Sequence, residues 1–168
     1  MANDSFITLN INTHGEVLKG DLEETEEVEK DEGTEVEHDF LSVHRFAKVA
    51  DDEDFTFILG PVLVPEEVDK QGEIISAEEI EQAAHSFIED NGTAGLVHKV
   101  MLKRREAVVV ESYIERGNRK VNGQTIKKGT WMLGMRVYDN DIRKMILDGD
   151  LKGYSIGGTG RRIEEDDE

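Results

Sequence analysis

Cysteine is absent from this chain of 168 residues. Disulfide bonds, thiolate metal sites and a cysteine nucleophile are therefore excluded. No apolar run approaches the roughly 20 residues that a membrane-spanning helix needs. The N-terminal sequence MANDSFITLN also lacks the basic-then-apolar pattern of a secretion signal. These absences favour a cytoplasmic protein without a membrane partner.

Positive charge is scarce as well, because 20 basic residues stand against 38 acidic ones, for a net charge of −18. Nucleic-acid binding by the whole chain is therefore disfavoured. The imbalance is uneven: residues 1–59 carry 17 acidic and 4 basic side chains (net −13), whereas residues 95–162 carry 7 and 15 (net +8). A basic face on the C-terminal half is expected to match an acidic partner or the protein's own acidic arm.

The length favours one domain with a single sizeable core. Residues 21–39 are a run of like charges with few apolar side chains, so residues 1–54 are predicted to form an acidic, largely disordered arm. Within this arm, residues 40–50 have apolar side chains at helical spacing and predict a short amphipathic helix. Residues 163–168 form an acidic tail.

Residues 55–162 have the pattern of a folded domain. Ser76 and Glu79 form a capping box that predicts a helix running to about Asp90, and Asn122-Gly123 suits a tight hairpin. The expected strands cover 55–65, 95–101, 107–115, 129–139 and a last piece from 151, with a second helix at 140–150. Because the middle strands are joined by hairpin-length links, we expect an α+β, mainly β fold: a small antiparallel β-barrel or a strongly bent sheet flanked by helices.

The stretch LKGYSIGGTGRR near the C-terminus places Ser155 in a Gly-x-Ser-x-Gly pattern. The nucleophile elbow of α/β-hydrolases is excluded, because no histidine follows this serine. A base that precedes the serine remains open, since unrelated folds assemble the same chemistry in different chain orders. Of the five histidines, three lie in or next to the acidic arm, His85 suits a structural position between helix and sheet, and His98 lies in an expected strand.

The expected pairing of strands places a carboxylate next to His98. If residues 103–106 form the turn between adjacent strands, Glu111 lies opposite His98. Glu111 also interrupts a run of valines, where a charge needs an explanation. Two interpretations remain open: a carboxylate that orients the imidazole, or a glutamate that faces solvent.

Several stretches, taken in order, resemble the XkdF-like phage serine proteases, which in turn resemble the prohead proteases of tailed phages and, distantly, herpesvirus assemblin. The stretches are GPVLVPEEVDKQGEIISAEEIEQAAHSFIED, GLVHKVM, VVVESYI, IKKGTWMLGMRVYD and LKGYSIGG. The resemblance covers roughly residues 57–162, and makes 55–162 a prohead-protease-like domain. It implies a β-barrel core wrapped by helices, a serine nucleophile on a late strand and a histidine base on an earlier one.

By this resemblance, Ser155 is the nucleophile and His98 the base. In such enzymes the third member of the triad generally lies a couple of dozen residues after the serine, and this sequence ends before that point. Three alternatives stay open: the third residue lies elsewhere, with Glu111 as our first choice and Glu164 as the second, the chain is a fragment, or the site is degenerate. Gly157 and Gly158 allow backbone to approach a substrate carbonyl. The tandem Arg161 and Arg162 resemble arginines that support an oxyanion site in these enzymes.

The implied function is a serine endopeptidase that cleaves scaffold or major capsid protein inside an assembling prohead in the host cytoplasm. It needs no metal or other cofactor, and self-association inside the prohead is compatible with it. Two alternatives stay open. One is a catalytically silent virion or capsid-assembly protein that keeps the fold, and the other is a scaffold-like module whose acidic arm binds capsid protein.

Overall fold

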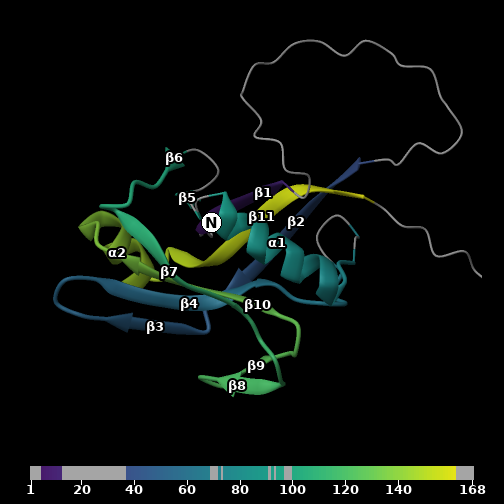
Figure 1. Ribbon diagram of the computed structural model, residues 1–168. Coiled ribbons are helices and arrows are strands. Elements are labelled where there is room, and N and C mark those ends of the chain that lie inside the picture. Colours follow the sequence, from purple (N-terminus) through teal and green to yellow (C-terminus); the bar gives the residue numbers. More distant parts are fainter. Residues whose placement is uncertain are drawn as a thin grey trace, which may run out of the picture.

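In the computed structural model, the described part of the chain forms two β-sheets that face each other, with two helices (Figure 1). The structure describes residues 5–12, 37–68, 72, 74–90, 92, 94–96 and 100–161. The five-stranded sheet has the order β2 (Glu37–Arg45), β11 (Leu151–Arg161), β1 (Ser5–Asn12), β5 (Gly95–Leu96) and β6 (Val100–Met101). The four-stranded sheet has the order β3 (Lys48–Asp51), β4 (Thr56–Leu63), β10 (Trp131–Val137) and β7 (Ala107–Ile114). A separate hairpin joins β8 (Arg119–Val121) to β9 (Gln124–Ile126).

The main core lies between the two sheets and is completed by the helices. Alternate residues of β1, β4, β10 and β11 point into it, as the two-residue period of a strand requires. The largest side chains that are fully buried there include Ile7, Ile58, Trp131, Leu133, Tyr154 and Ile156. This composition bears out the expectation of an α+β, mainly β fold.

Helix α1 (Ala77–Glu89) forms where the sequence predicts it. The Ser76 hydroxyl accepts a hydrogen bond from the Glu79 amide at 3.3 Å, and the Glu79 carboxylate accepts one from the Ser76 amide at 3.0 Å. This capping box satisfies amides that have no partner within the helix. The face formed by Ile80, Ala83, Ala84 and Phe87 is buried against the sheets. Helix α2 (Asn140–Leu147) likewise buries Ile142 and Ile146, and neither helix is long and apolar enough to cross a membrane.

The two sheets meet at a corner where the chain passes from β2 to β3. The Phe46 amide donates to the Lys152 carbonyl of the five-stranded sheet, and the next amide, of Ala47, donates to Leu59 of the four-stranded sheet. Gly60 allows this approach, because a Cβ there would lie 3.1 Å from the Phe46 Cα. The described strands thus form two sheets joined at one corner, and the closed barrel among the expected architectures is not found.

The N-terminal strands differ from the expected acidic arm. Strand β1 lies between β11 and β5, and the side chains of Ile7 and Leu9 are 0% exposed. The folded unit therefore includes strands N-terminal to the expected start at Phe55. The helix predicted for residues 40–50 is wrong, because this segment contains the end of β2 and most of β3. Its apolar spacing fits a helix, but pairing with β11 and β4 determines its conformation.

The strand pairing predicted for residues 95–101 and 107–115 is also wrong. Residues 95–101 pair with themselves, Gly95 with Met101 and Leu96 with Val100, while β7 pairs with β10. By contrast, the turn expected at Asn122-Gly123 is confirmed. Both residues have positive φ, 47° and 83°, as a tight two-residue hairpin requires.

Candidate active site

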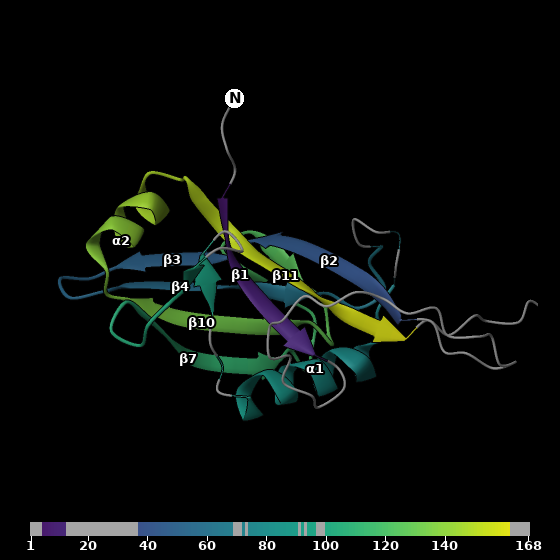
Figure 2. The same cartoon turned by 90° about the horizontal axis from the view of Figure 1, so that it is seen from above.

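Ser155 lies on β11, the strand between β1 and β2 (Figure 2). Its neighbours in register are Thr8 on β1 and Val43 on β2. The residues on either side of it, Tyr154 and Ile156, are fully buried in the core between the sheets. Because successive side chains of a strand alternate in direction, Ser155 points to the outer face of the five-stranded sheet. It is nevertheless only 3% exposed.

Glycines flank this serine in the strand. Gly157, two residues later, shares its face of the sheet and adds no side chain there. Gly153 lies where the register between β1 and β11 shifts, since Ser5 pairs with Leu151 but Ile7 pairs with Tyr154. This extra residue is a β-bulge, a feature that often re-aims a side chain next to an active site.

Gly153 is required by the close approach of β2. A Cβ at this position would lie 1.8 Å from the His44 carbonyl oxygen, a distance that no packing tolerates. We expect Gly153→Ala to lower the free energy of unfolding by about 3 kcal/mol or more, because β2 must separate from β11. Urea unfolding measures this effect. The matched control is Gly117→Ala, where a Cβ meets nothing within 4 Å and the expected change is within about 0.5 kcal/mol. An equal effect of the two substitutions would contradict the tight contact.

His98 lies outside the described residues, so its pairing with Ser155 stays a prediction. The same holds for Arg162 and Glu164. Among the remaining predicted residues, Gly158 pairs with Phe40 on β2, and Arg161 pairs with Glu37. Gly157 and Gly158 both lie between two paired strands, where ladder hydrogen bonds ordinarily use the backbone amides. A role of these two glycines as oxyanion donors therefore remains a prediction as well.

Glu111 does not lie beside Ser155. The register that placed it opposite His98 does not exist, because β7 pairs with β10 and Glu111 lies opposite Gly134. The β7 register shifts by one residue next to it, and this bulge leaves both Val110 and Glu111 exposed. Glu111 packs over Gly134 and Phe57 on the outer face of the four-stranded sheet. The core thus separates it from Ser155, and the bulge explains the charge within the run of valines.

His44 is the described histidine nearest to Ser155 in strand register, and sequence reasoning set it aside with the acidic arm. It lies on β2 opposite Tyr154, so its side chain is on the other face of the sheet from Ser155. Its Nε2 atom is 2.8 Å from the Ser42 hydroxyl oxygen. Burial lowers the pKa of the His44 imidazole, and the charge of Glu67 opposes this shift. The geometry makes His44 a structural residue rather than a base for Ser155.

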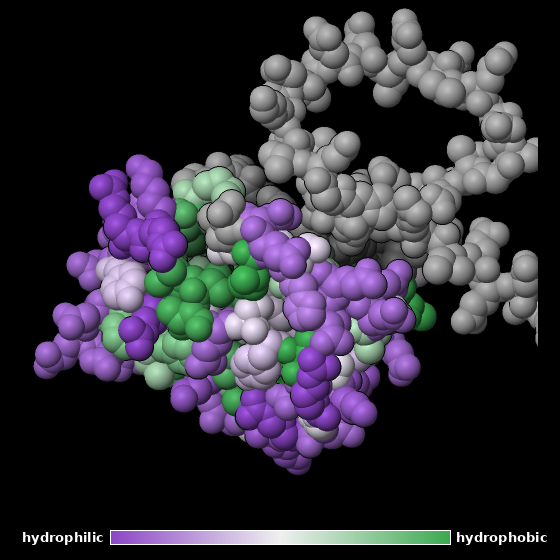
Figure 3. Space-filling model, in the orientation of Figure 1, coloured by the Kyte–Doolittle hydropathy of each residue, from purple (hydrophilic) through white to green (hydrophobic). Residues whose placement is uncertain are grey.

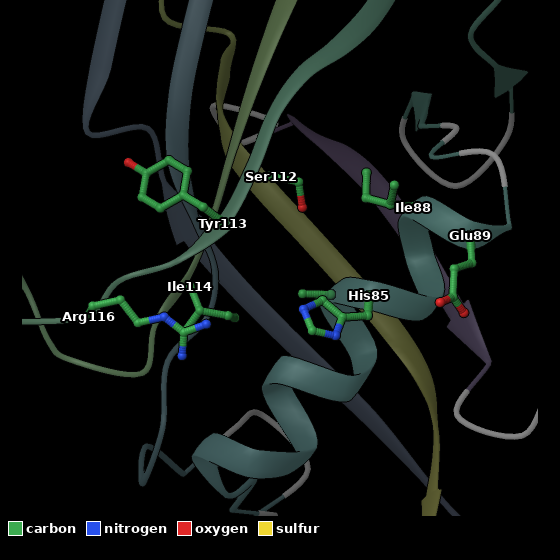
Figure 4. A pocket seen from close by; sticks show the side chains of 8 residues that line it. His85, Ile88, Glu89, Ser112, Tyr113, Ile114 and Arg116 are labelled. Carbon is green, nitrogen blue, oxygen red and sulfur yellow. The ribbon is translucent and has the colours of Figure 1, made fainter.

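A separate groove of about 470 Å³ lies between α1 and β7 (Figure 4). It is lined by Ala84, His85, Ile88, Glu89, Ser112, Tyr113, Ile114 and Arg116. Hydrophobic residues gather on this side of the surface, between β7 and α1 (Figure 3). In Figure 4, Ser112 points from β7 toward the helix that carries His85. The Ser112 hydroxyl accepts a hydrogen bond from Trp131 Nε1 at 3.0 Å, which gives this serine a structural role.

The described part of the chain contains no set of side chains that could bind a metal ion. No group of three or more histidine, aspartate or glutamate side chains lies there in an arrangement that holds a metal ion.

Sequence comparison connects this arrangement with a known family. A family profile described as "Putative phage serine protease XkdF" matches residues 42–164, a range that includes the four-stranded sheet and β11 with Ser155 but not β1. The chain belongs to this family. The resemblance suggested by the sequence motifs is thus confirmed at the level of the family.

Two curated relatives come from Bacillus subtilis (strain 168). The "Phage-like element PBSX protein XkdF" is 34% identical over 124 residues, which are 74% of this chain and 44% of that protein. The "Uncharacterized protein YqbD" is 37% identical over 123 residues, 73% of this chain and 37% of the relative. The chain spans less than half of the length of both relatives. No solved structure matches the chain significantly.

Proposed function

We propose that this XkdF-family chain is a serine endopeptidase that acts during assembly of a phage particle. The observation that carries the proposal is the position of Ser155. It lies in a Gly-x-Ser-x-Gly stretch on the strand between β1 and β2, inside the range matched by a family described as a serine protease. The bulge at Gly153 next to it supports the same conclusion, because bulges are over-represented beside active sites.

The proposed chemistry is acyl transfer through a covalent intermediate. The Ser155 hydroxyl oxygen attacks the carbonyl carbon of the scissile peptide bond, while the His98 imidazole takes the hydroxyl proton. The C–N bond then breaks, and His98 returns the proton to the leaving amine. Next, the imidazole deprotonates a water molecule, which hydrolyses the ester and frees Ser155. Because Glu111 lies across the core, we assign it no part in this mechanism.

The proposed substrates are the scaffold protein and the major capsid protein of the phage, cleaved within the prohead in the host cytoplasm. This part rests on the likeness of the family to prohead proteases. The burial of Ser155, which is 3% exposed, adds a requirement. A substrate carbonyl reaches the hydroxyl only after the groups that cover it have moved.

The same burial favours a second candidate function, a silent capsid-assembly protein that keeps the protease fold. A hydroxyl that stays covered does not attack a peptide bond, whatever its neighbours in sequence. The two functions differ in one observable property, the reactivity of Ser155.

A serine-directed fluorophosphonate probe tests this reactivity without knowledge of the substrate. We expect the full chain to be labelled at Ser155, as identified by mass spectrometry of the digested protein, and Ser155→Ala to lose the label. Ser112→Ala is the matched control, because Ser112 is a partly buried serine on a strand that faces a histidine-bearing helix. The Ser112→Ala variant should be labelled at Ser155 to the same extent as the unmodified chain. The absence of Ser155 labelling, together with intact capsid and scaffold proteins after incubation with the chain, would favour the silent function.

A further inference from the structure

The hairpin formed by β8 and β9 projects from the outer side of the four-stranded sheet (Figure 1). Its inner side is fixed to the sheet by apolar contacts. Ile126 is 2% exposed and belongs to a cluster with Met132 and Leu59, against which Val121 also packs. The Asn122 side-chain amide donates to the Ala47 carbonyl at 3.1 Å. The hairpin is therefore held in one position, and its polar side faces solvent.

This polar side is strongly basic. Residues 116–128 contain five basic side chains and no acidic one. Three of these have acidic neighbours: Arg116 pairs with Glu81, Arg119 pairs with Glu115, and Lys127 lies 3.9 Å from Glu67. For Lys120 and Lys128, both exposed, no carboxylate within ion-pair distance is found among the described residues. Positive charge thus remains uncompensated at the hairpin.

An acidic segment of the same chain has the complementary chemistry. Residues 21–32, between β1 and β2, contain eight acidic side chains and one basic side chain. The two strands that flank this segment, β1 and β2, belong to the five-stranded sheet. In Figure 1, the ends of β1 and β2 next to this segment lie at the top of the view, whereas the hairpin projects at the bottom, beyond the four-stranded sheet. The acidic segment and the basic hairpin are therefore attached to opposite sides of the molecule.

We propose that the β8–β9 hairpin binds the acidic segment, residues 21–32, of a second copy of this chain. Attachment of the two surfaces to opposite sides favours contact between molecules over contact within one molecule. Because the two surfaces differ, the contact is head-to-tail, and such contacts extend into chains or close into rings. The proposal holds whether or not the chain is a protease.

Sedimentation velocity of the full chain tests the proposal. The average mass should rise with protein concentration at 50 mM salt and fall at 500 mM, because screening weakens contacts between exposed charges. The double substitution K120E/K128E should weaken association at least tenfold, and it removes no ion pair between described residues. The control K103E/R105E makes the same charge change at another exposed turn, where neither side chain forms an ion pair with a described residue, and it should associate like the unmodified chain. Thermal unfolding checks that both variants are folded.

A mixing experiment identifies the occupant. A full chain with Glu23, Glu24, Glu26, Glu27 and Glu29 all changed to glutamine should be monomeric alone, as should K120E/K128E. Mixed together, the first offers an intact hairpin and the second an intact acidic segment, so a complex of one copy of each should form and not grow further. The proposal is overturned by a monomeric unmodified chain at low salt, by association that survives K120E/K128E, or by a mixture that stays monomeric. Hairpin-dependent binding of a DNA duplex without self-association would also overturn it.

Discussion

Replacing Ser155 by alanine is expected to lower the rate of peptide-bond cleavage by at least about 10³-fold, and His98→Ala should do the same. The attacking oxygen and the group that removes its proton act as one unit, so losing either stops the same step. The double variant should therefore be no slower than each single variant. The measurement is the rate at which the full chain cleaves capsid or scaffold protein, followed by gel electrophoresis and mass spectrometry of the products.

The control for this pair is Glu111→Gln, which keeps the size of the side chain and removes its charge. Glu111 is exposed on the outer face of the four-stranded sheet, with the core between it and Ser155. We expect the cleavage rate of this variant to stay within about twofold of the unmodified rate. If Glu111→Gln loses as much activity as His98→Ala, the carboxylate orients the base after all. If Ser155→Ala keeps full activity, the assignment of the nucleophile is wrong.

Removal of β1 is expected to unfold the protein. This strand separates β11 from β5 in the five-stranded sheet, and its Ile7 and Leu9 side chains are 0% exposed. A chain that lacks residues 1–12 should have no cooperative thermal transition, since one edge of β11 and part of the core are lost together. The single substitution Leu9→Ala should lower the free energy of unfolding by about 2–5 kcal/mol, as other large-to-small changes in cores do.

Circular dichroism during heating and in urea measures both effects. The matched control is Val49→Ala on the edge strand β3, where the side chain is 44% exposed and the expected loss is below about 1 kcal/mol. A cooperative transition at an unchanged temperature after removal of residues 1–12 would show that β1 is dispensable. Strand β1 would then lie outside the part of the chain that is needed for folding.

Local signals in the sequence predict the parts of the fold that depend on near neighbours. The capping box of Ser76 and Glu79 predicts the start of α1, and the side chains that α1 buries follow from their spacing alone. Asn122-Gly123 predicts the hairpin turn, because positive φ angles are needed there. In each case the residues that specify the structure lie within a few positions of one another.

Pairing between distant strands has no such local signal. Strand β1 pairs in parallel with β11, so that Thr8, near one end of the sequence, is the neighbour of Ser155, near the other end. In β1 apolar and polar residues alternate over only a few positions, and an acid-rich segment follows. The sequence therefore gives no reason to place this strand in the core. Likewise, the candidate site could be predicted only in part. The Gly-x-Ser-x-Gly pattern indicates Ser155. The expected contact between Glu111 and His98, however, depended on pairing residues 95–101 with residues 107–115, and in the structure β5 pairs with β6 instead.

The central place of β11 has a consequence for the order of folding during synthesis. Both β1 and β2 pair with β11, so neither finds its main partner until residues 151–161 have left the ribosome. The pairings of β11 with β1 and β2 have the largest sequence separation among the described strands, and contacts of this kind form late because they close the longest loops. The four-stranded sheet has all its strands available earlier. Since Ser155 is itself on β11, the strand neighbours that position its hydroxyl come together only after β11 has been made, and a nascent chain that stops short of β11 cannot display an assembled nucleophile.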